Sequence, residues 1–417
     1  MKRSHSKCLA QAGFTLIELV ISMAVFLVVL IIASDAFNKI VSQSAKYSKM
    51  EESNIEGVIG LEIMRHDLEQ IGAGLPWAFK SVITYGEATD NVGLTLNDAP
   101  SAIPRAFVGQ KALGAFTSDY IGVKGVTVSN TKASQRWTYI PYLNYSTSTG
   151  PESRPIIWPS NNLQSTSPAD RVIVIRHNFN DSSDDHLLLD SGGIFFSNYY
   201  TNGNFADDFL PTSDQQTHMV YGIVNSSSNQ PRMPFNRADF FIKVPDATTA
   251  SALPQFCAPS TGVLYKATVN HNNNSGTSGG GYNYTPLLDC VADMQVVMGW
   301  DSSDGGSVGS VDVYSSLPLA NGTVVSSVTS LAGTIQGYLT NAKDLREHLK
   351  VVKIYLLAQE GKVDTGYNAP ASIEVGDHLV DGLYPIRTFS LTATQRHYRW
   401  KLYRIIARPK NLSSNQR

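Results

Sequence analysis

A run of twenty apolar residues, Phe14–Ala33, constrains this chain most, because it contains a single carboxylate, Glu18. About 20 apolar residues are enough to span the hydrocarbon core of a bilayer. An ionised side chain at that depth costs at least ~2.5 kcal/mol, so an acid inside such a run points to a function. The preceding residues, 1–13, form a polar leader with three Lys or Arg side chains. This charge predicts that the leader stays in the cytoplasm and that the rest of the chain is exported.

The junction between the leader and the apolar run resembles a known processing signal. A cut after Gly13 would leave a free amine on Phe14, four residues from Glu18 or close to the Glu18 of a neighbouring copy. The stretch Gly13–Val20, GFTLIELV, resembles the class III signal of type IV pilins and type II secretion pseudopilins. In that family an inner-membrane prepilin peptidase cleaves after the glycine and methylates the new N-terminal phenylalanine. The resemblance therefore implies cleavage between Gly13 and Phe14, N-methylation of Phe14, and pairing of Glu18 with a neighbouring amine that sets subunit register.

Two other export signals could contain such an apolar run. An ordinary secretory signal is cleaved after the apolar stretch, and residues 32–35 could loosely serve as its cleavage site. A plain signal anchor would also be long enough to span the membrane. Neither alternative explains Glu18, or a glycine placed directly before the run.

The apolar helix is expected to continue as an amphipathic one over residues 34–72. No proline interrupts residues 34–71, and Gly72, Gly74 and Pro76 then provide stop signals. Apolar residues recur at steps of three and four, which predicts that one face packs on a domain: Val58, Leu61, Met64, Leu68 and Ile71. We therefore expect residues 14–33 to lie in lipid or a filament core and residues 34–72 to carry the globular part.

The remainder of the chain has the pattern of short strands. Within the region 75–256, which we treat as a β-rich insert of uncertain fold, strands are predicted at 171–176, 193–200, 218–224 and 238–244, and a further strand follows at 262–269. In the region 257–417, core-facing and solvent-facing residues alternate around Met294–Trp300, Val352–Leu356 and Tyr398–Tyr403. Such alternation predicts an antiparallel sheet with one solvated face, whose other face receives the amphipathic helix. The predicted fold class is α+β.

The C-terminal region also resembles a more specific family. Three segments, Cys290–Asp301, Leu345–Gly361 and Arg399–Leu412, are similar in order and in motif to the minor pilin family PilW. The helix end, Arg65–Gly74, is loosely similar to the same family. The resemblance implies a minor pilin that resides in the inner membrane and then joins a priming complex at the pilus tip. It implies as partners the major pilin, other minor pilins of the PilV, PilX and FimU types, and a PilY-type tip adhesin. Such pili serve adhesion, twitching motility or DNA uptake.

Cysteine usage agrees with export. Cys8 lies in the leader, which leaves Cys257 and Cys290 as a pair in a compartment that permits disulfides. In the chain-entropy model, the loop closed by a bond between them would stabilise the folded state by about 3–4 kcal/mol. Two free buried thiols are the alternative, and the exported location favours the disulfide.

No catalytic motif stands out, so we expect neither an enzyme nor a cofactor. Asp181, Asp184 and Asp185, between His177 and His186, are weak candidates for a cation site, although a solvated polar loop fits them better. Asp301–Gly306 resembles only the first half of a calcium loop, and is expected to form a hairpin turn. The last strand is basic, but the chain as a whole has a net charge of −2, which argues against nucleic acid as a partner.

Two other functions compete with a tip-located minor pilin. The first is a minor pseudopilin of a type II secretion system, similar to the J subunit, which uses the same helix. The second is an adhesin in which the aromatic-rich insert contacts a surface or polymer and the pilin helix serves as carrier. Deletion of residues 77–256 would separate the adhesin from the others, because an adhesin would lose attachment while the cells kept their pili.

Overall fold

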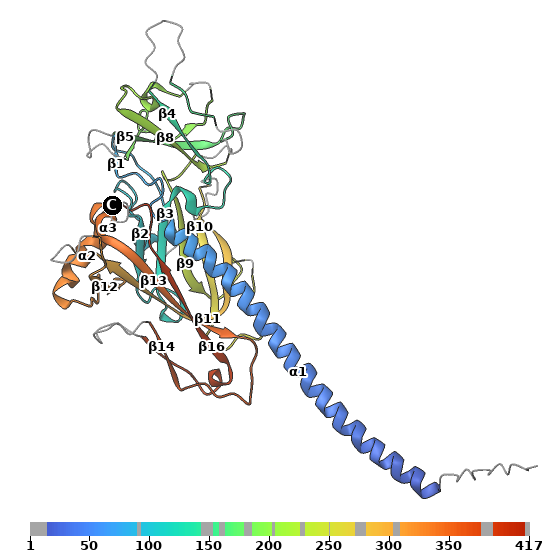
Figure 1. Ribbon diagram of the computed structural model, residues 1–417. Helices are drawn as coiled ribbons and strands as arrows, with labels where there is room; N and C mark the ends of the chain where they lie inside the picture. Colours follow the sequence, from blue (N-terminus) through green and yellow to red (C-terminus); the bar gives the residue numbers. More distant parts are fainter. Residues whose placement is uncertain are drawn as a thin grey trace, which may run out of the picture. The chain divides into compact units, whose positions relative to one another are not determined.

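A computed structural model describes most of the chain and divides it into two compact units (Figure 1). The units are Met1–Glu52 and Ser53–Arg417, and the long helix α1, Leu16–Glu69, runs through the boundary between them. The predicted α+β class is confirmed, with a long N-terminal helix and a globular antiparallel sheet domain. The described residues are 15–89, 93–142, 153–157, 163–178, 186–201, 205–225, 230–249, 251–271, 281–302, 309–376 and 387–412.

The second unit is built on an eight-stranded sheet with the order β16-β13-β11-β10-β9-β3-β2, and β12 also pairs with β11. Every pairing in it is antiparallel, as the sequence predicted. Its strands are β2 (Phe107–Gln110), β3 (Tyr120–Gly125), β9 (Asn236–Lys243), β10 (Gly262–Val269), β11 (Tyr282–Trp300), β12 (Val313–Ser316), β13 (Leu349–Glu360) and β16 (Arg399–Ala407).

A second sheet of six strands has a core of its own. Its order is β1-β6-β5-β8-β4, with β7 paired to β5, and all but the β1–β6 pair are antiparallel. The strands are β1 (Ala78–Phe79), β4 (Trp137–Pro141), β5 (Arg171–Asn178), β6 (Leu187–Leu188), β7 (Ser197–Asn198) and β8 (Gln216–Val224). The buried side chains on one face form a separate apolar cluster that includes Ile140, Val172, Val174, Tyr199 and Val220.

The remaining elements are short. A two-stranded sheet consists of β14 (Ser372–Val375) and β15 (Arg387–Ser390). Two helices, α2 (Ala332–Thr340) and α3 (Ala342–His348), precede β13, and the Asn341 side chain caps α3 by accepting from the Lys343 and Asp344 amides. The 3₁₀ turns are η1 (Gly93–Leu96), η2 (Ala115–Thr117), η3 (Val126–Val128), η4 (Asp207–Phe209), η5 (Thr329–Leu331) and η6 (Gln395–His397).

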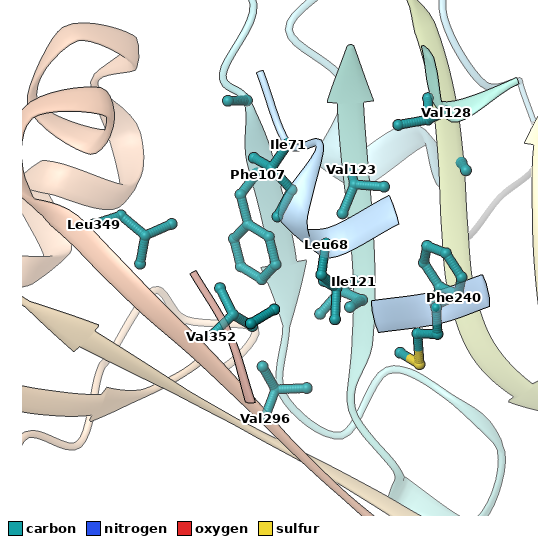
Figure 2. Close-up of a cluster of buried hydrophobic side chains, with 14 of the residues drawn as sticks. Leu68, Ile71, Phe107, Ile121, Val123, Val128, Phe240, Val296, Leu349 and Val352 are labelled. Carbon is teal, nitrogen blue, oxygen red and sulfur yellow. The ribbon is translucent and has the colours of Figure 1, made fainter. Parts of the chain in front are cut away.

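The main core lies where the end of α1 meets the large sheet (Figure 2). Figure 2 shows Leu68 from the helix and Ile71 beyond its end among labelled side chains of β2, β3, β9, β11 and β13. Fully buried members of this core include Ile121, Val123, Phe240, Val352 and Phe107. The apolar spacing in residues 61–71 therefore identified the buried face of the helix.

Most of the predicted strands are present, and strands from the regions 75–256 and 257–417 pair with one another. The prediction at 262–269 coincides with β10, whereas the one at 193–200 is confirmed only at β7. Strand β9, from the region 75–256, pairs with β10, from the region 257–417. Both regions thus contribute strands to one sheet.

The expectation of one solvated sheet face is wrong for the central strands. All of β13 except Glu360 is buried, and β11 is continuously buried from Val291 to Trp300. The reason is that the small sheet covers this face. Its residues Ile373 and Phe389, with Trp400, pack against another apolar cluster, which consists of Ala292, Val297, Tyr355, Leu357 and Val375. The alternation predicted around Tyr398–Tyr403 also fails on β16. It placed Leu402 on the core side, but Leu402 is exposed, whereas Ile405 and Ala407 are buried.

Candidate functional site

The start of helix α1 is capped by its own side chains. The Glu18 carboxylate Oε2 accepts hydrogen bonds from the Thr15 amide (3.0 Å) and from the Thr15 hydroxyl (2.9 Å). In return, the Glu18 amide donates to the Thr15 hydroxyl (3.4 Å), which completes a reciprocal capping box. A carboxylate in the first turn also complements the positive end of the helix dipole. The predicted cleavage-site residues, Gly13 and Phe14, lie outside the described residues.

The first part of α1 is apolar and fully exposed within its unit. Within Leu16–Ala45 the most apolar 18-residue window has a mean hydropathy of 3.0, and none of these residues is buried. In the described chain this is the one helix that is long and apolar enough to cross a membrane. A helix that is apolar all round is stable only in lipid or among other apolar helices. One polar interruption, Ser22, is satisfied locally, since its hydroxyl donates to the Leu19 carbonyl (2.9 Å).

The second part of α1 approaches the sheet closely because two of its residues are glycine. A Cβ atom at Gly60 would lie 1.9 Å from the backbone oxygen of Leu287 in β11. Leu61, Met64 and Leu68 are buried next to this contact. Val58, which the spacing assigned to the buried face, is 62% exposed. An α-helix has 3.6 residues per turn, which places Val58 outside the buried face of α1 that contains Gly57, Gly60 and Met64.

The C-terminal segment holds the end of α1. The Lys410 amide donates to the Glu69 carbonyl (2.9 Å), and its ammonium forms an ion pair with the Glu69 carboxylate (2.5 Å). Leu412 is fully buried, with a methyl group near Gly72, whose φ of +80° suits glycine. Residues 410–412 thus hold the end of the helix against the globular unit.

A buried ion pair lies under the same turn of the helix. The Lys266 ammonium is 2.6 Å from the Asp67 carboxylate, and both side chains are almost fully buried. Burial raises the pKa of Asp67, while the charge of Lys266 opposes this rise. The pair joins the helix to β10, and the sequence contained no signal that would have matched the two residues.

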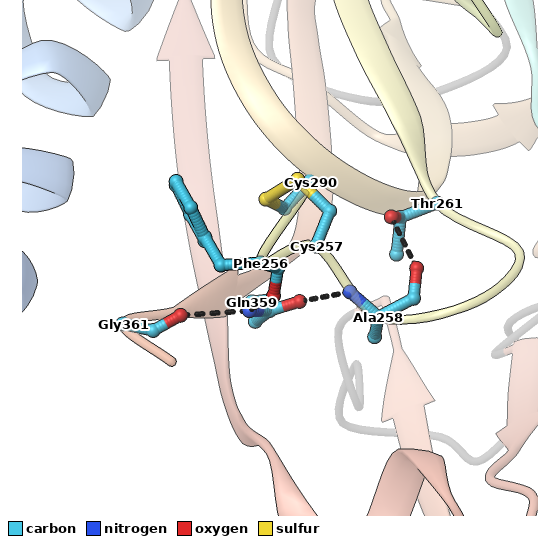
Figure 3. The surroundings of a disulfide bond; sticks show 7 residues. All are labelled: Phe256, Cys257, Ala258, Thr261, Cys290, Gln359 and Gly361. Carbon is cyan, nitrogen blue, oxygen red and sulfur yellow. Dashed lines mark hydrogen bonds between the residues drawn. A yellow bond between two sulfur atoms is a disulfide. The ribbon is translucent and has the colours of Figure 1, made fainter. Parts of the chain in front are cut away.

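The predicted disulfide between Cys257 and Cys290 is present, with Cα atoms 5.1 Å apart (Figure 3). The amide of buried Gln359 supports it, because its oxygen accepts from the Ala258 amide (2.5 Å) and its nitrogen donates to the Phe256 carbonyl (2.9 Å). The glutamine of β13 therefore holds the loop that carries one of the cysteines.

A network of buried charges ties residues 87–105 to the large sheet. The Glu87 carboxylate is 2.7 Å from the Lys124 ammonium and 2.9 Å from the Arg237 guanidinium. Arg237 also pairs with Asp239 (2.8 Å), and Lys124 with Asp98 (2.6 Å). Sequence reasoning missed this network, although charged residues inside the otherwise apolar stretch 236–243 were a signal for it.

The prediction of cation ligands concerns residues that the structure does not describe. Asp181, Asp184 and Asp185 lie outside the described residues. His186 stacks on Trp77 with ring centroids 3.8 Å apart, and His177 meets it edge-on at 4.1 Å. Within the part of the chain that the structure covers, no group of three or more His, Cys, Asp or Glu side chains could hold a metal ion.

The basic strand β16 lies at an edge of the large sheet and contacts acids of its own chain. Lys401 is 3.5 Å from Glu360, and Arg399 is 3.5 Å from Asp364. The Arg396 guanidinium donates to the Ala369 carbonyl (2.8 Å). Positive side chains on an edge strand also discourage unwanted strand pairing.

Comparison with known families finds one match. Residues 8–34 match the prokaryotic N-terminal methylation motif, the signal of type IV pilins. Neither the search of curated proteins nor the search of solved structures returned a match. The motif supports a type IV pilin-like prepilin, that is, a pilin or a pseudopilin, which a prepilin peptidase processes and which assembles with other pilins. With the apolar helix, it supports anchoring in the membrane followed by incorporation into a pilus.

Proposed function

We propose that this protein is a minor pilin of a type IV pilus, similar to PilW, that primes pilus assembly within a complex at the tip. The observation that carries the proposal is the exposed apolar helix Leu16–Ala45, which begins within the methylation signal at residues 8–34. The same chain continues into a large globular unit. The helix needs other apolar helices around it, and a filament supplies them. No catalytic role is required of any residue.

Processing follows from the signal. The prepilin peptidase cleaves between Gly13 and Phe14 and methylates the Phe14 amine. Glu18, which caps its own helix in the isolated chain, then becomes available to the amine of a neighbouring subunit. Exchange of an intrachain partner for an intermolecular one keeps the carboxylate satisfied in both states, which limits its cost inside lipid.

The tip location rests on size and on family resemblance. The globular unit, Ser53–Arg417, combines a sheet of eight strands with a second sheet of six. Such a bulky domain is accommodated most easily where no subunit lies above it. The resemblance adds other minor pilins and a PilY-type adhesin as neighbours at that position.

The test measures major pilin in the sheared surface fraction of a strain that lacks this chain, with whole-cell pilin as control. Loss of surface pilin at normal cellular levels supports a priming role. Unchanged surface pilin contradicts it. In that case, loss of secreted proteins in the same strain would identify a J-like pseudopilin instead.

A further inference from the structure

One guanidinium in the second unit has no counter-ion among the residues that the structure describes. Arg232 is half-buried, and no ion pair among the described residues involves it. Its single side-chain hydrogen bond within the described chain goes to the Glu87 carbonyl (2.8 Å). Burial lowers the pKa of Arg232, yet a guanidinium stays charged under all physiological conditions. A half-buried guanidinium that has no acidic partner can pair with an anion through charge-assisted hydrogen bonds.

The neighbouring acids cannot supply that anion. Both carboxylate oxygens of Glu87 are already in use: Oε1 accepts from the Asp98 and Ala99 amides, and Oε2 from Lys124 and Arg237. His271, which accepts the Arg232 amide at 3.2 Å, adds no negative charge. Burial and the nearby Arg232 lower the pKa of His271 to about 4, so its ring is neutral at pH 7. No acid of the described residues therefore compensates the positive charge of Arg232.

Arg232 lines a pocket of about 510 Å³ between segments that are distant in the sequence. The walls come from the chain before Glu87, from the turn at residues 193–196, and from residues 230–232; they include Thr84, Gly86, Phe196 and Gln230. A Cβ atom at Gly86 would lie 3.4 Å from Nη2 of Arg232, so the glycine leaves the guanidinium accessible. The backbone of Arg232 is fixed, because the Gly86 amide donates to its carbonyl at 2.8 Å.

We propose that this pocket binds an acidic sugar, with Arg232 holding the sugar carboxylate. A guanidinium matches a carboxylate with two parallel hydrogen bonds, which fixes orientation as well as charge. The hydroxyl of Thr84 and the amide of Gln230 suit the ring hydroxyls, and the half-exposed ring of Phe196 offers an apolar surface to the sugar face. The pocket volume fits one or two sugar rings, since ligand sites commonly span roughly 300–1,000 Å³. The inference concerns this pocket alone and does not depend on the role of the chain in pilus assembly.

The test is a binding titration of the full-length protein in detergent micelles, followed by saturation-transfer NMR. Three probes separate the contributions: glucuronate carries both carboxylate and ring, glucose carries the ring alone, and acetate carries the carboxylate alone. We expect glucuronate to bind at least tenfold more tightly than either of the other probes. No saturable glucuronate binding, or equal affinity for glucuronate and either single-feature probe, would overturn the assignment.

Two variants and a control locate the site. Arg232→Gln keeps a donor toward the Glu87 carbonyl and removes the charge, and should weaken glucuronate binding at least tenfold. Thr84→Trp fills the pocket from an exposed position, so it reports on the site even if the arginine variant unfolds. Arg154→Gln, at an exposed arginine outside the pocket, should bind as the wild type does. Glucuronate binding that survives Thr84→Trp, or survives Arg232→Gln in a folded protein, refutes the proposal.

Discussion

Replacement of Gly60 by alanine places a methyl group at the closest approach between helix α1 and strand β11. The new Cβ would lie 1.9 Å from the Leu287 oxygen and 2.6 Å from the Leu287 carbonyl carbon. Cβ atoms essentially never approach other heavy atoms more closely than 3.0 Å, so the helix must withdraw by about 1 Å. The obstacle is backbone, and no change of rotamer can relieve it.

Two effects of opposite sign compete in this variant. Alanine is favoured over glycine inside a helix by about 1 kcal/mol, which would stabilise the protein if the helix stood alone. Overpacking typically costs about 1–3 kcal/mol. Withdrawal also loosens Leu61, Met64 and Leu68, each of which gains roughly 1.5–3 kcal/mol from full burial. We expect a net loss of about 2–4 kcal/mol, which changes the unfolding equilibrium constant by a factor of roughly 30 or more.

Urea unfolding of the full-length protein, followed by tryptophan fluorescence, measures this loss; Trp300 is a fully buried reporter. Gly57→Ala is the matched control on the same helix face. Its Cβ would meet the flexible Leu288 side chain at 3.1 Å, so its stability should be unchanged or raised by up to about 1 kcal/mol. If Gly60→Ala proves as stable as Gly57→Ala, the close approach of helix and strand is wrong.

Three further predictions concern buried groups in the globular unit. Reduction of the Cys257–Cys290 bond should lower the free energy of unfolding by about 3–4 kcal/mol, and equal stability with and without reductant would contradict this. Arg237→Met leaves Asp239 buried without its cation and should cost about 3–5 kcal/mol; a thermal-unfolding loss below about 1 kcal/mol would show that the pair is not buried. Burial raises the pKa of Asp293 to about 6, opposed by the nearby Arg387 charge, so the folded state retains a proton that the unfolded state releases. The free energy of unfolding should therefore fall as pH rises from about 4 to 6, and Asp293→Asn should remove up to about 3 kcal/mol of that fall. A variant whose free energy of unfolding changes with pH as that of the wild type does would contradict this.

The prediction of the strands succeeded where local pattern and tertiary environment agree. Strand β10 was predicted at its observed bounds, because a run of β-formers there is flanked by turn residues. The prediction at 193–200 failed for most of its length, since a turn centred on Gly192 and Gly193 occupies its start. Alternation on β13 correctly selected Val352, Ile354 and Leu356 for the main core, but it could not show that Tyr355 and Leu357 are also buried. That depends on the small sheet formed by Ser372–Val375 and Arg387–Ser390, which the alternation in β13 does not encode.

The site shows the same division. Glu18 and the processing signal are local in sequence, and so is the capping box, because a helix brings residues three apart onto one turn. The ion pair of Lys410 with Glu69 joins residues that are 341 positions apart, and no spacing rule predicts such a pairing. Arg232 and its pocket are equally invisible in the sequence, since three separate segments make the walls.

The sequence by itself determined the apolar helix, its signal, the disulfide pair and the α+β class. Each of these depends on short-range periodicity, on composition, or on there being only one possible cysteine pair outside residues 1–13. Only the tertiary structure decided which sheet face is solvated, how closely α1 approaches β11, and which buried charges are paired. Those outcomes depend on contacts between residues far apart in the chain, where the free energy of one side chain is set by neighbours that its own segment does not specify.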